Sequence, residues 1–205
     1  GFLGNRVGVY AMQVAMTEAI KMSLSIEEAD AVFGRPMGIP KTGVFALYDL
    51  IGIDLMADVL ASFKKELPDN DEFQKVIEGT PVIKKLIESG YTGRKGKGGF
   101  YRINKSNNKK VLEALNLSKN EYFPTKKIDL RIDKVNLLEL INRNDKYGKY
   151  AWSVISKIIL YASSLVPQIT EEYNDIDEAL RLGFNWSMGP FEMLETIGLD
   201  NFFSK

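Results

Sequence analysis

The amino-acid sequence predicts an all-α protein built from two related helical units. Apolar residues recur at helical spacing over residues 7–90, and no stretch there alternates as a β-strand would. A short pattern also occurs twice, as GVFALYDLIGID at residues 43–54 and as GPFEMLETIGLD at residues 189–200. Glycine, phenylalanine, acidic and aliphatic positions of the two copies match at a constant offset of 146 residues. The repeat therefore indicates one helical packing unit that is used twice.

The helices of the first unit are marked by start and stop signals. Residues 7–22 are apolar on almost every side, which predicts a helix buried by its neighbours. Ser25 and Glu28 form a capping box that begins a second helix. Asp54, which follows a glycine, is expected to cap a later one. The remaining helices are expected at residues 44–51, 55–67, 73–79 and 81–89.

The second unit repeats this order of elements. Asn174 or Asp175 is expected to cap one helix, and Asp200 is expected to cap another in the way that Asp54 does. The segment IEEA at residues 26–29 pairs with IDEA at residues 176–179 at an offset of 150. We place the four-residue difference from the other pattern in the loop around residues 38–41, because loops tolerate insertions. Helices are expected at residues 151–169, 173–184 and 190–197.

The net charge is zero, but the charges are unevenly distributed. Residues 1–101 carry 12 basic and 13 acidic side chains, residues 102–149 carry 12 and 6, and residues 150–205 carry 3 and 8. We interpret the basic middle as a solvated linker, since it has too few aromatic residues to favour the alternative of nucleic-acid binding. The expected organisation is a first helical domain at residues 1–101, a basic linker at 102–146 and a second, degenerate copy at 147–205.

The composition excludes several kinds of chemistry. The chain has no Cys and no His, so it has no disulfide, no thiolate and no imidazole to act as a base or a metal ligand. We expect no metal site and, from the cysteine usage, a cytoplasmic protein. No run of about 18 apolar residues is present, so no membrane span is expected. Because the chain opens with Gly-Phe rather than Met, it is expected to be an excised fragment.

Two segments are candidates for function. Asn5 lies at the start of the buried helix, where it is either an N-cap or an amide that reaches into a cleft and both donates and accepts hydrogen bonds. GYTGRKGKGGFYR at residues 90–102 combines glycines with cations, so it either cradles a phosphate or forms a tight surface loop. Asp49 and Glu195 are paired by the repeat, but each lies within its own helix, and we expect capping or packing roles rather than shared acid–base chemistry.

Particular motifs point to a family. GFLGNR before a buried helix, the GxFxLxDxxGxD unit and GRKxGxGFY together resemble the C-terminal part of 3-hydroxyacyl-CoA dehydrogenases of fatty-acid β-oxidation. KYAWSVISKIILYASSLVP followed by IDEALRLGFNWSMGPFEMLETIGLD resembles the second helical domain of the long, multifunctional members. The resemblance covers residues 1–101 and about 147–205. It implies helical domains of the 6-phosphogluconate dehydrogenase C-terminal-like type.

The resemblance also implies a function. The family oxidises L-3-hydroxyacyl-CoA to 3-ketoacyl-CoA with NAD, and the GFLGNR asparagine, here Asn5, borders the substrate cleft. The family's catalytic His and its nucleotide-binding glycines are absent, so NAD is expected to bind an upstream domain and the isolated fragment is expected to be inactive. The second copy is expected to lack a cleft and to cover the apolar surface of the first. The expected partners are the acyl-CoA substrate, the NAD-binding domain and, in a possible homodimer, a second copy. The alternative is a non-catalytic helical assembly or dimerisation module.

Overall fold

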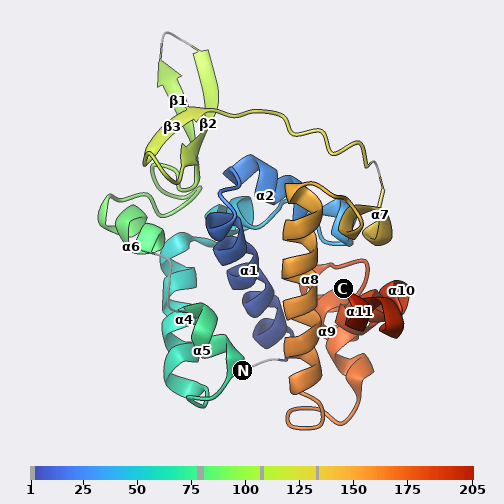
Figure 1. Ribbon diagram of the computed structural model, residues 1–205. Coiled ribbons are helices and arrows are strands. Elements are labelled where there is room, and N and C mark those ends of the chain that lie inside the picture. The colour runs from blue at the N-terminus through green and yellow to red at the C-terminus, as the bar shows by residue number, and fades with distance from the viewer. Residues whose placement is uncertain (1–2, 78–80, 107–108, 133) are drawn as a thin grey trace.

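The helix α1 (Leu3–Lys21) lies at the centre of the molecule, with other helices around it (Figure 1). The computed structural model describes residues 3–77, 81–106, 109–132 and 134–205. Every residue from Val7 to Met16 is buried, because α2, α5, α8 and α9 all contact this helix. A helix that is apolar on every side must be surrounded by other elements to be kept from water. The expectation of a helix buried on most sides is confirmed.

Each helix that the sequence of the first unit predicts is present among the described residues, and the last two residues of the one expected at 73–79 lie outside them. The Ser25 side chain accepts a hydrogen bond from the Glu28 N–H at 3.2 Å, and the Glu28 carboxylate accepts one from the Ser25 N–H at 3.0 Å, so the capping box is confirmed. Asp54 is not an N-cap, because its helix begins one residue earlier with Gly52 in the cap position. The elements are α2 (Ile26–Val32), the short 3₁₀-helix η1 (Arg35–Met37), α3 (Phe45–Ile51), α4 (Ile53–Glu66), α5 (Glu72–Ile77) and α6 (Pro81–Glu88).

The second unit supplies the helices that cover α1. Both α8 and α9 pack against α1, while α10 packs against α8 and α9. The expected caps are wrong: Glu172 occupies the N-cap position of α9 in place of Asn174 or Asp175, and Gly198 rather than Asp200 precedes α11. The elements are α7 (Leu137–Ile141), α8 (Lys146–Ser164), α9 (Tyr173–Phe184), α10 (Pro190–Ile197) and α11 (Leu199–Ser204).

A small antiparallel sheet projects from the helical body (Figure 1). Its strands β1 (Tyr101–Ser106), β2 (Lys109–Asn116) and β3 (Glu121–Pro124) lie side by side in chain order. They fall within the segment expected to be a basic linker, so that segment is not a linker alone. The strands were not predicted because lysines interrupt the alternation of apolar and polar residues. The pairing also depends on a contact between distant residues, in which the N–H of the buried Leu115 donates to the Phe100 carbonyl at 2.8 Å.

The repeated pattern encodes a carboxylate that caps the next helix. Asp30 in α2 accepts hydrogen bonds from the N–H groups of Phe45 and Ala46 at 2.7 and 3.1 Å, at the start of α3. Asp177 in α9 accepts bonds from the N–H groups of Phe191 and Glu192, both at 3.0 Å, at the start of α10. Each carboxylate satisfies two backbone donors that the helix leaves open and lies at the helix's positive end.

Asp30 and Asp177 are thus equivalent residues, which corrects one sequence expectation. The pairing of IEEA with IDEA at an offset of 150 is wrong, because the capping carboxylates lie 147 positions apart, close to the 146 of the later pattern. The loops of the two units therefore differ by one residue rather than four. The segments IEEA and IDEA are similar only in composition, whereas the hydrogen bonds identify the two aspartates that cap the following helix.

The first glycine of each repeat allows the two helices of a unit to approach. A Cβ atom on Gly43 would lie 2.4 Å from the Asp30 Cβ, and one on Gly189 would lie 2.3 Å from the Asp177 Cα. Gly43 also has φ +78°, a backbone conformation that favours glycine. The glycine is repeated because the capping aspartate of the preceding helix occupies the space of its side chain.

Replacing these glycines is expected to destabilise the fold. Gly43→Ala should lower the free energy of unfolding by about 2–3 kcal/mol, since it adds both a clash and backbone strain, and Gly189→Ala by about 1–3 kcal/mol. Gly183 in α9 is the matched control, because its Cβ would meet no atom within 4 Å. Gly183→Ala should raise stability by roughly 0.5–1 kcal/mol. Urea unfolding measures all three, and equal effects would contradict the proposed close approach.

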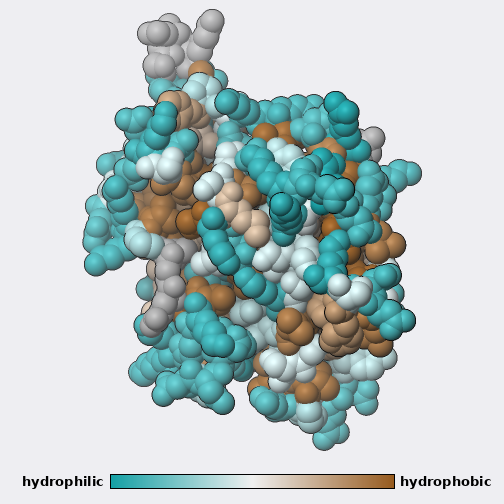
Figure 2. Space-filling view, in the orientation of Figure 1, coloured by the Kyte–Doolittle hydropathy of each residue, from teal (hydrophilic) through white to brown (hydrophobic). Residues whose placement is uncertain are grey.

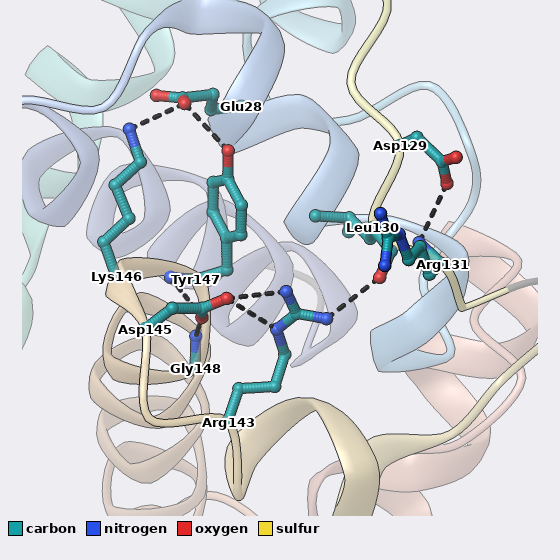
Figure 3. A network of polar contacts seen from close by, with 9 residues as sticks. All are labelled: Glu28, Asp129, Leu130, Arg131, Arg143, Asp145, Lys146, Tyr147 and Gly148. Carbon is teal, nitrogen blue, oxygen red and sulfur yellow. Dashed lines mark hydrogen bonds and ion pairs between the residues drawn. The ribbon is translucent and has the colours of Figure 1, made fainter.

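Polar contacts anchor the start of α8 to the first unit (Figure 3). Glu28 in α2 pairs with Lys146 at 2.6 Å and accepts a hydrogen bond from the Tyr147 hydroxyl at 2.9 Å. Asp145 caps α8 by accepting bonds from the N–H groups of Tyr147 and Gly148, both at 3.0 Å. These bonds fix the start of α8 against α2, so α8 meets α1 in a defined register.

Candidate functional site

Asn5 lies in the first described turn of α1, with its side chain exposed. It is not an N-cap, because Leu3 and Gly4 before it are already helical. Among the described residues, no hydrogen bond to the Asn5 amide is found, and the amide faces outward at the end of a helix whose remaining turns are buried. The structure therefore leaves this donor and acceptor available to a ligand or to another domain.

Arg6 holds the end of α1 in place beside Asn5. The Arg6 guanidinium forms an ion pair with Asp71 and donates a hydrogen bond to the Tyr161 hydroxyl at 2.7 Å. Tyr161 in α8 in turn donates to Asp71 at 3.1 Å and stacks on Tyr10 with the ring centroids 3.9 Å apart. Three segments that are distant in sequence are joined here, so the position of the Asn5 backbone is fixed by both units.

Two small residues bring α9 against this same turn. A Cβ atom on Gly4 would lie 3.1 Å from the Ala179 carbonyl oxygen, and one on Gly8 would lie 2.3 Å from the Phe184 ring. The glycines are four residues apart, so they share one face of α1. The face beside Asn5 is thus closed by the second unit, which leaves Asn5 at the edge of the contact.

A second ion pair joins α1 to α8 further along the helix. The Glu18 carboxylate pairs with Lys157 and accepts a hydrogen bond from Ser153 at 2.7 Å. Burial alone raises the pKa of Glu18, but the bonds from Lys157 and Ser153 outweigh it and lower that pKa overall. Glu18 is buried whereas the Lys157 side chain is 39% exposed, and both Ser153 and Lys157 lie on α8, so the pair aligns the two helices.

Asp49 and Glu195 do different things. Asp49 in α3 accepts hydrogen bonds from the N–H groups of Phe100 and Tyr101 at 2.8 and 2.7 Å, whereas Glu195 is exposed on α10. The packing role expected for Asp49 is confirmed, and the two carboxylates belong to separate units. Burial raises the pKa of Asp49 to about 6, against the opposing effect of the two N–H donors.

The glycine-rich segment is a closed turn built on Asp49. The Gly93 N–H donates to the Gly98 carbonyl at 2.8 Å, and the Arg94 N–H donates to the Asp49 carbonyl at 2.8 Å. The turn is followed by β1. Its cations point outward, since Arg94 and Lys97 are both exposed.

The buried aspartates predict a pH dependence of stability. Burial raises the pKa of Asp30 to about 7, although the Phe45 N–H and the Tyr101 hydroxyl oppose this. The folded state therefore binds a proton more tightly than the unfolded state, whose Asp pKa is about 3.9. Stability should fall as the pH rises from about 4 to about 7, by on the order of 2–4 kcal/mol, and then level off.

Asp30→Asn tests this assignment, because the amide does not titrate. Thermal unfolding between pH 5 and pH 8 should show a smaller decrease in the variant than in the wild type. Glu18, Glu28 and Asp145 have lowered pKa values, so their contribution to stability is lost as the pH falls, below this pH range. Parallel pH profiles for the two proteins would refute a raised pKa at Asp30.

Sequence reasoning missed the two capping carboxylates. Asp30 lies outside the segments that were matched, and Asp177 lies inside IDEA but was aligned with Glu27. The register of the repeated glycines pairs Asp30 with Ile176, so the two aspartates come together only when one residue of difference between the loops is allowed. Arg6 was read as part of a motif and Asp71 was not considered, because their contact spans 65 positions. The described residues include no group of three or more acidic side chains that could hold a metal ion. Among the described helices, none has the length and hydropathy needed to cross a lipid bilayer.

Fold and site together define a helical domain in which a second unit braces the first and leaves one amide exposed at the helix end. The C-terminal domain of 3-hydroxyacyl-CoA dehydrogenase matches residues 1–103 and 150–203 of the chain. The chain therefore belongs to the 3-hydroxyacyl-CoA dehydrogenase family, as its motifs indicated. The residues between the two matched stretches contain the end of β1, the strands β2 and β3, and α7.

Relatives agree with this assignment, and a solved structure agrees with the fold. The chain is 41% identical over 201 residues to a putative fatty acid oxidation complex trifunctional enzyme of Rickettsia prowazekii, covering 98% of the chain and 28% of the relative. It is 31% identical to a probable 3-hydroxyacyl-CoA dehydrogenase of Bacillus subtilis, covering 97% and 26%. The crystal structure of 3-hydroxybutyryl-CoA dehydrogenase from Escherichia coli shares the fold, with a TM-score of 0.66 at 20% identity, over 98% of the chain and 54% of that structure. The chain thus spans about a quarter of the length of these curated relatives.

Proposed function

We propose that this chain forms one wall of the acyl-CoA cleft in an NAD-dependent L-3-hydroxyacyl-CoA dehydrogenase of fatty-acid oxidation. The observation that carries the proposal is the exposed amide of Asn5 on a rigid helix end, within a domain of this family. The amide can donate to the substrate carbonyl oxygen and accept from an imidazole N–H. Its position is held by Arg6 and by the contact of α9 with Gly4 and Gly8, so little conformational entropy is lost when substrate binds.

The described residues do not fit the cofactor. The glycine-rich turn at residues 93–98 is followed by a strand and not by a helix, and it lies near α2, beyond the opposite end of α1 from Asn5 (Figure 1). A dinucleotide phosphate site of the strand–turn–helix kind needs a helix N-terminus at that place. We therefore place the NAD site and the catalytic base in another domain. The part of this chain is to orient the substrate and to help exclude water.

We propose two copies of the helical unit, at residues 1–101 and 147–205, of which only the first faces substrate. A homodimer is also proposed, because apolar side chains gather over α9–α11 (Figure 2). Leu182 and Phe203 are each 79% exposed there. Light scattering of the purified chain at rising concentration measures whether it pairs. The proposed location of the protein is the cytoplasm.

The isolated chain is expected to be inactive. With no His, it has no base to remove the hydroxyl proton. The measurement is the oxidation of NADH with acetoacetyl-CoA, for the chain alone and for the chain joined to an NAD-binding domain ahead of residue 1. Activity only in the joined protein supports the proposal. Activity of the chain alone would refute it, and a joined protein that binds both ligands without turnover would favour the helical assembly module instead.

A further inference from the structure

A cleft of about 960 Å³ lies between the sheet and the first helical unit, away from Asn5. Three segments border it: the β1–β2 pair, the glycine-rich turn and the loop that leads into α3. Asp30 and Asp49 lie at its floor, where the N–H groups of Phe45 and Phe100 are among their partners. These carboxylates are bonded within the fold, so the groups open to a ligand are those on the walls and rim.

One wall of the cleft is an uncovered apolar surface. Ile103 and Leu112 are directly opposite each other in the β1–β2 register, so their side chains lie on the same face of the sheet. They are 58% and 49% exposed, and both line the cleft. Two large aliphatic side chains at directly opposed positions form an apolar platform of the size of an aromatic ring. The next cross-strand pair on the same face toward the turn is Lys105 with Lys110, so the platform ends in positive charge.

The rim of the cleft carries positive charge without a partner. Lys41, Arg94, Lys97 and Lys105 all line it, and among the described residues none of the four forms an ion pair. Arg102, which also lines the cleft, is paired with Glu113 at 2.8 Å. The four unpaired cations come from three separate segments and surround one opening. This distribution favours a ligand with several negative charges.

The glycines of the turn leave the backbone accessible at the same opening. Gly96 and Gly98 line the cleft, and Gly98 has φ +126°, which favours a residue without a side chain. Backbone near a ligand without intervening side chains is typical of phosphate-binding turns. The turn therefore supplies two of the four cations, Arg94 and Lys97, as well as the close approach.

We propose that this cleft binds a nucleotide that carries two or more phosphates. The flat base lies on the platform of Ile103 and Leu112, and the phosphates lie between Lys41, Lys97 and their neighbours on the rim. A mononucleotide diphosphate is of the size that pockets of this volume hold. The inference does not depend on the proposed dehydrogenase function, because no residue of α1, Asn5 included, lines the cleft.

Calorimetric titration of the 205-residue chain with ADP and, separately, with inorganic pyrophosphate tests the proposal. Lys41→Ala combined with Lys97→Ala should weaken ADP binding at least tenfold at low salt. Lys127→Ala combined with Lys149→Ala makes the same change in net charge at exposed lysines that do not line the cleft, and should stay within twofold of the wild type. Thermal unfolding of each variant checks that the fold is intact.

Ile103→Ser separates the platform from the charge. It should weaken ADP binding about fivefold and leave pyrophosphate binding unchanged, because pyrophosphate has no base to lie on the platform. The proposal is overturned if the wild type does not bind ADP at millimolar concentration, if ADP binds no more tightly than pyrophosphate, or if the control pair of lysines weakens ADP as much as the cleft pair does.

Discussion

Asn5→Ala is expected to reduce dehydrogenase activity at least about tenfold in the protein joined to its NAD-binding domain, equal to roughly 1.4 kcal/mol of transition-state stabilisation. The reason is the loss of an amide that α1 presents at a fixed place, held by Arg6 on one side and by α9 on the other. The loss should appear in kcat/KM for acetoacetyl-CoA. Because Asn5 is exposed, the free energy of unfolding should change by less than about 0.5 kcal/mol.

Asn174→Ala is the matched control for this variant. Asn174 is also an exposed asparagine near the start of a helix, on α9 in the second unit. Its removal should leave kcat/KM unchanged, because we propose that only the first unit faces substrate. Equal losses in the two variants would show that the effect is not specific to Asn5. Full activity of Asn5→Ala would remove Asn5 from the cleft while leaving the family assignment intact.

Asp30→Ala is expected to lower the free energy of unfolding by about 3–5 kcal/mol. It leaves the N–H groups of Phe45 and Ala46 and the Tyr101 hydroxyl without their acceptor, each at a cost of about 1–3 kcal/mol when buried. The substitution also opens a cavity between α2 and α3. For a chain of this size, the midpoint of thermal unfolding should fall by roughly 6–15 °C.

Asp177→Ala and Asp58→Ala complete that comparison. Asp177 holds the equivalent N–H groups in the second unit but receives no tyrosine hydroxyl, so about 2 kcal/mol is expected. Asp58 is exposed on α4, and its replacement should cost less than about 0.5 kcal/mol. If Asp30→Ala unfolds no earlier than Asp58→Ala, then the capping role assigned to the repeat is wrong.

The helices could be predicted from the sequence because their signals are local. The capping box at Ser25 and the apolar positions of α1 act within a few residues of each other, and they require no knowledge of the rest of the chain. The duplicated pattern was also visible, because both copies carry a glycine at the position where no side chain fits. Its purpose was not visible, because the carboxylate that fills that space lies on the preceding helix.

The sheet and the cleft could not be predicted, because they depend on contacts between distant segments. Phe100 and Leu115 are bonded across the two strands at the end of the β1–β2 hairpin away from its turn, so the pairing joins residues that no local pattern links. The cations of the glycine-rich turn were noted, but the opposite wall, Ile103 and Leu112, lay in the segment expected to be a linker. Asn5 was singled out through a family motif, while its anchors, Asp71 just before α5 and residues of α8 and α9, emerged only from the packing.

The most direct test of the central claim is photolabelling with a 3-ketoacyl-CoA that carries a diazirine near the keto group, applied to the chain joined to its NAD-binding domain. Mass spectrometry identifies the labelled peptide. The account predicts label in the first turns of α1, around Asn5, and its loss when unlabelled acetoacetyl-CoA is added in excess. Label found only outside α1, or label that unlabelled substrate does not displace, would contradict the claim that this helix end forms a wall of the acyl-CoA cleft.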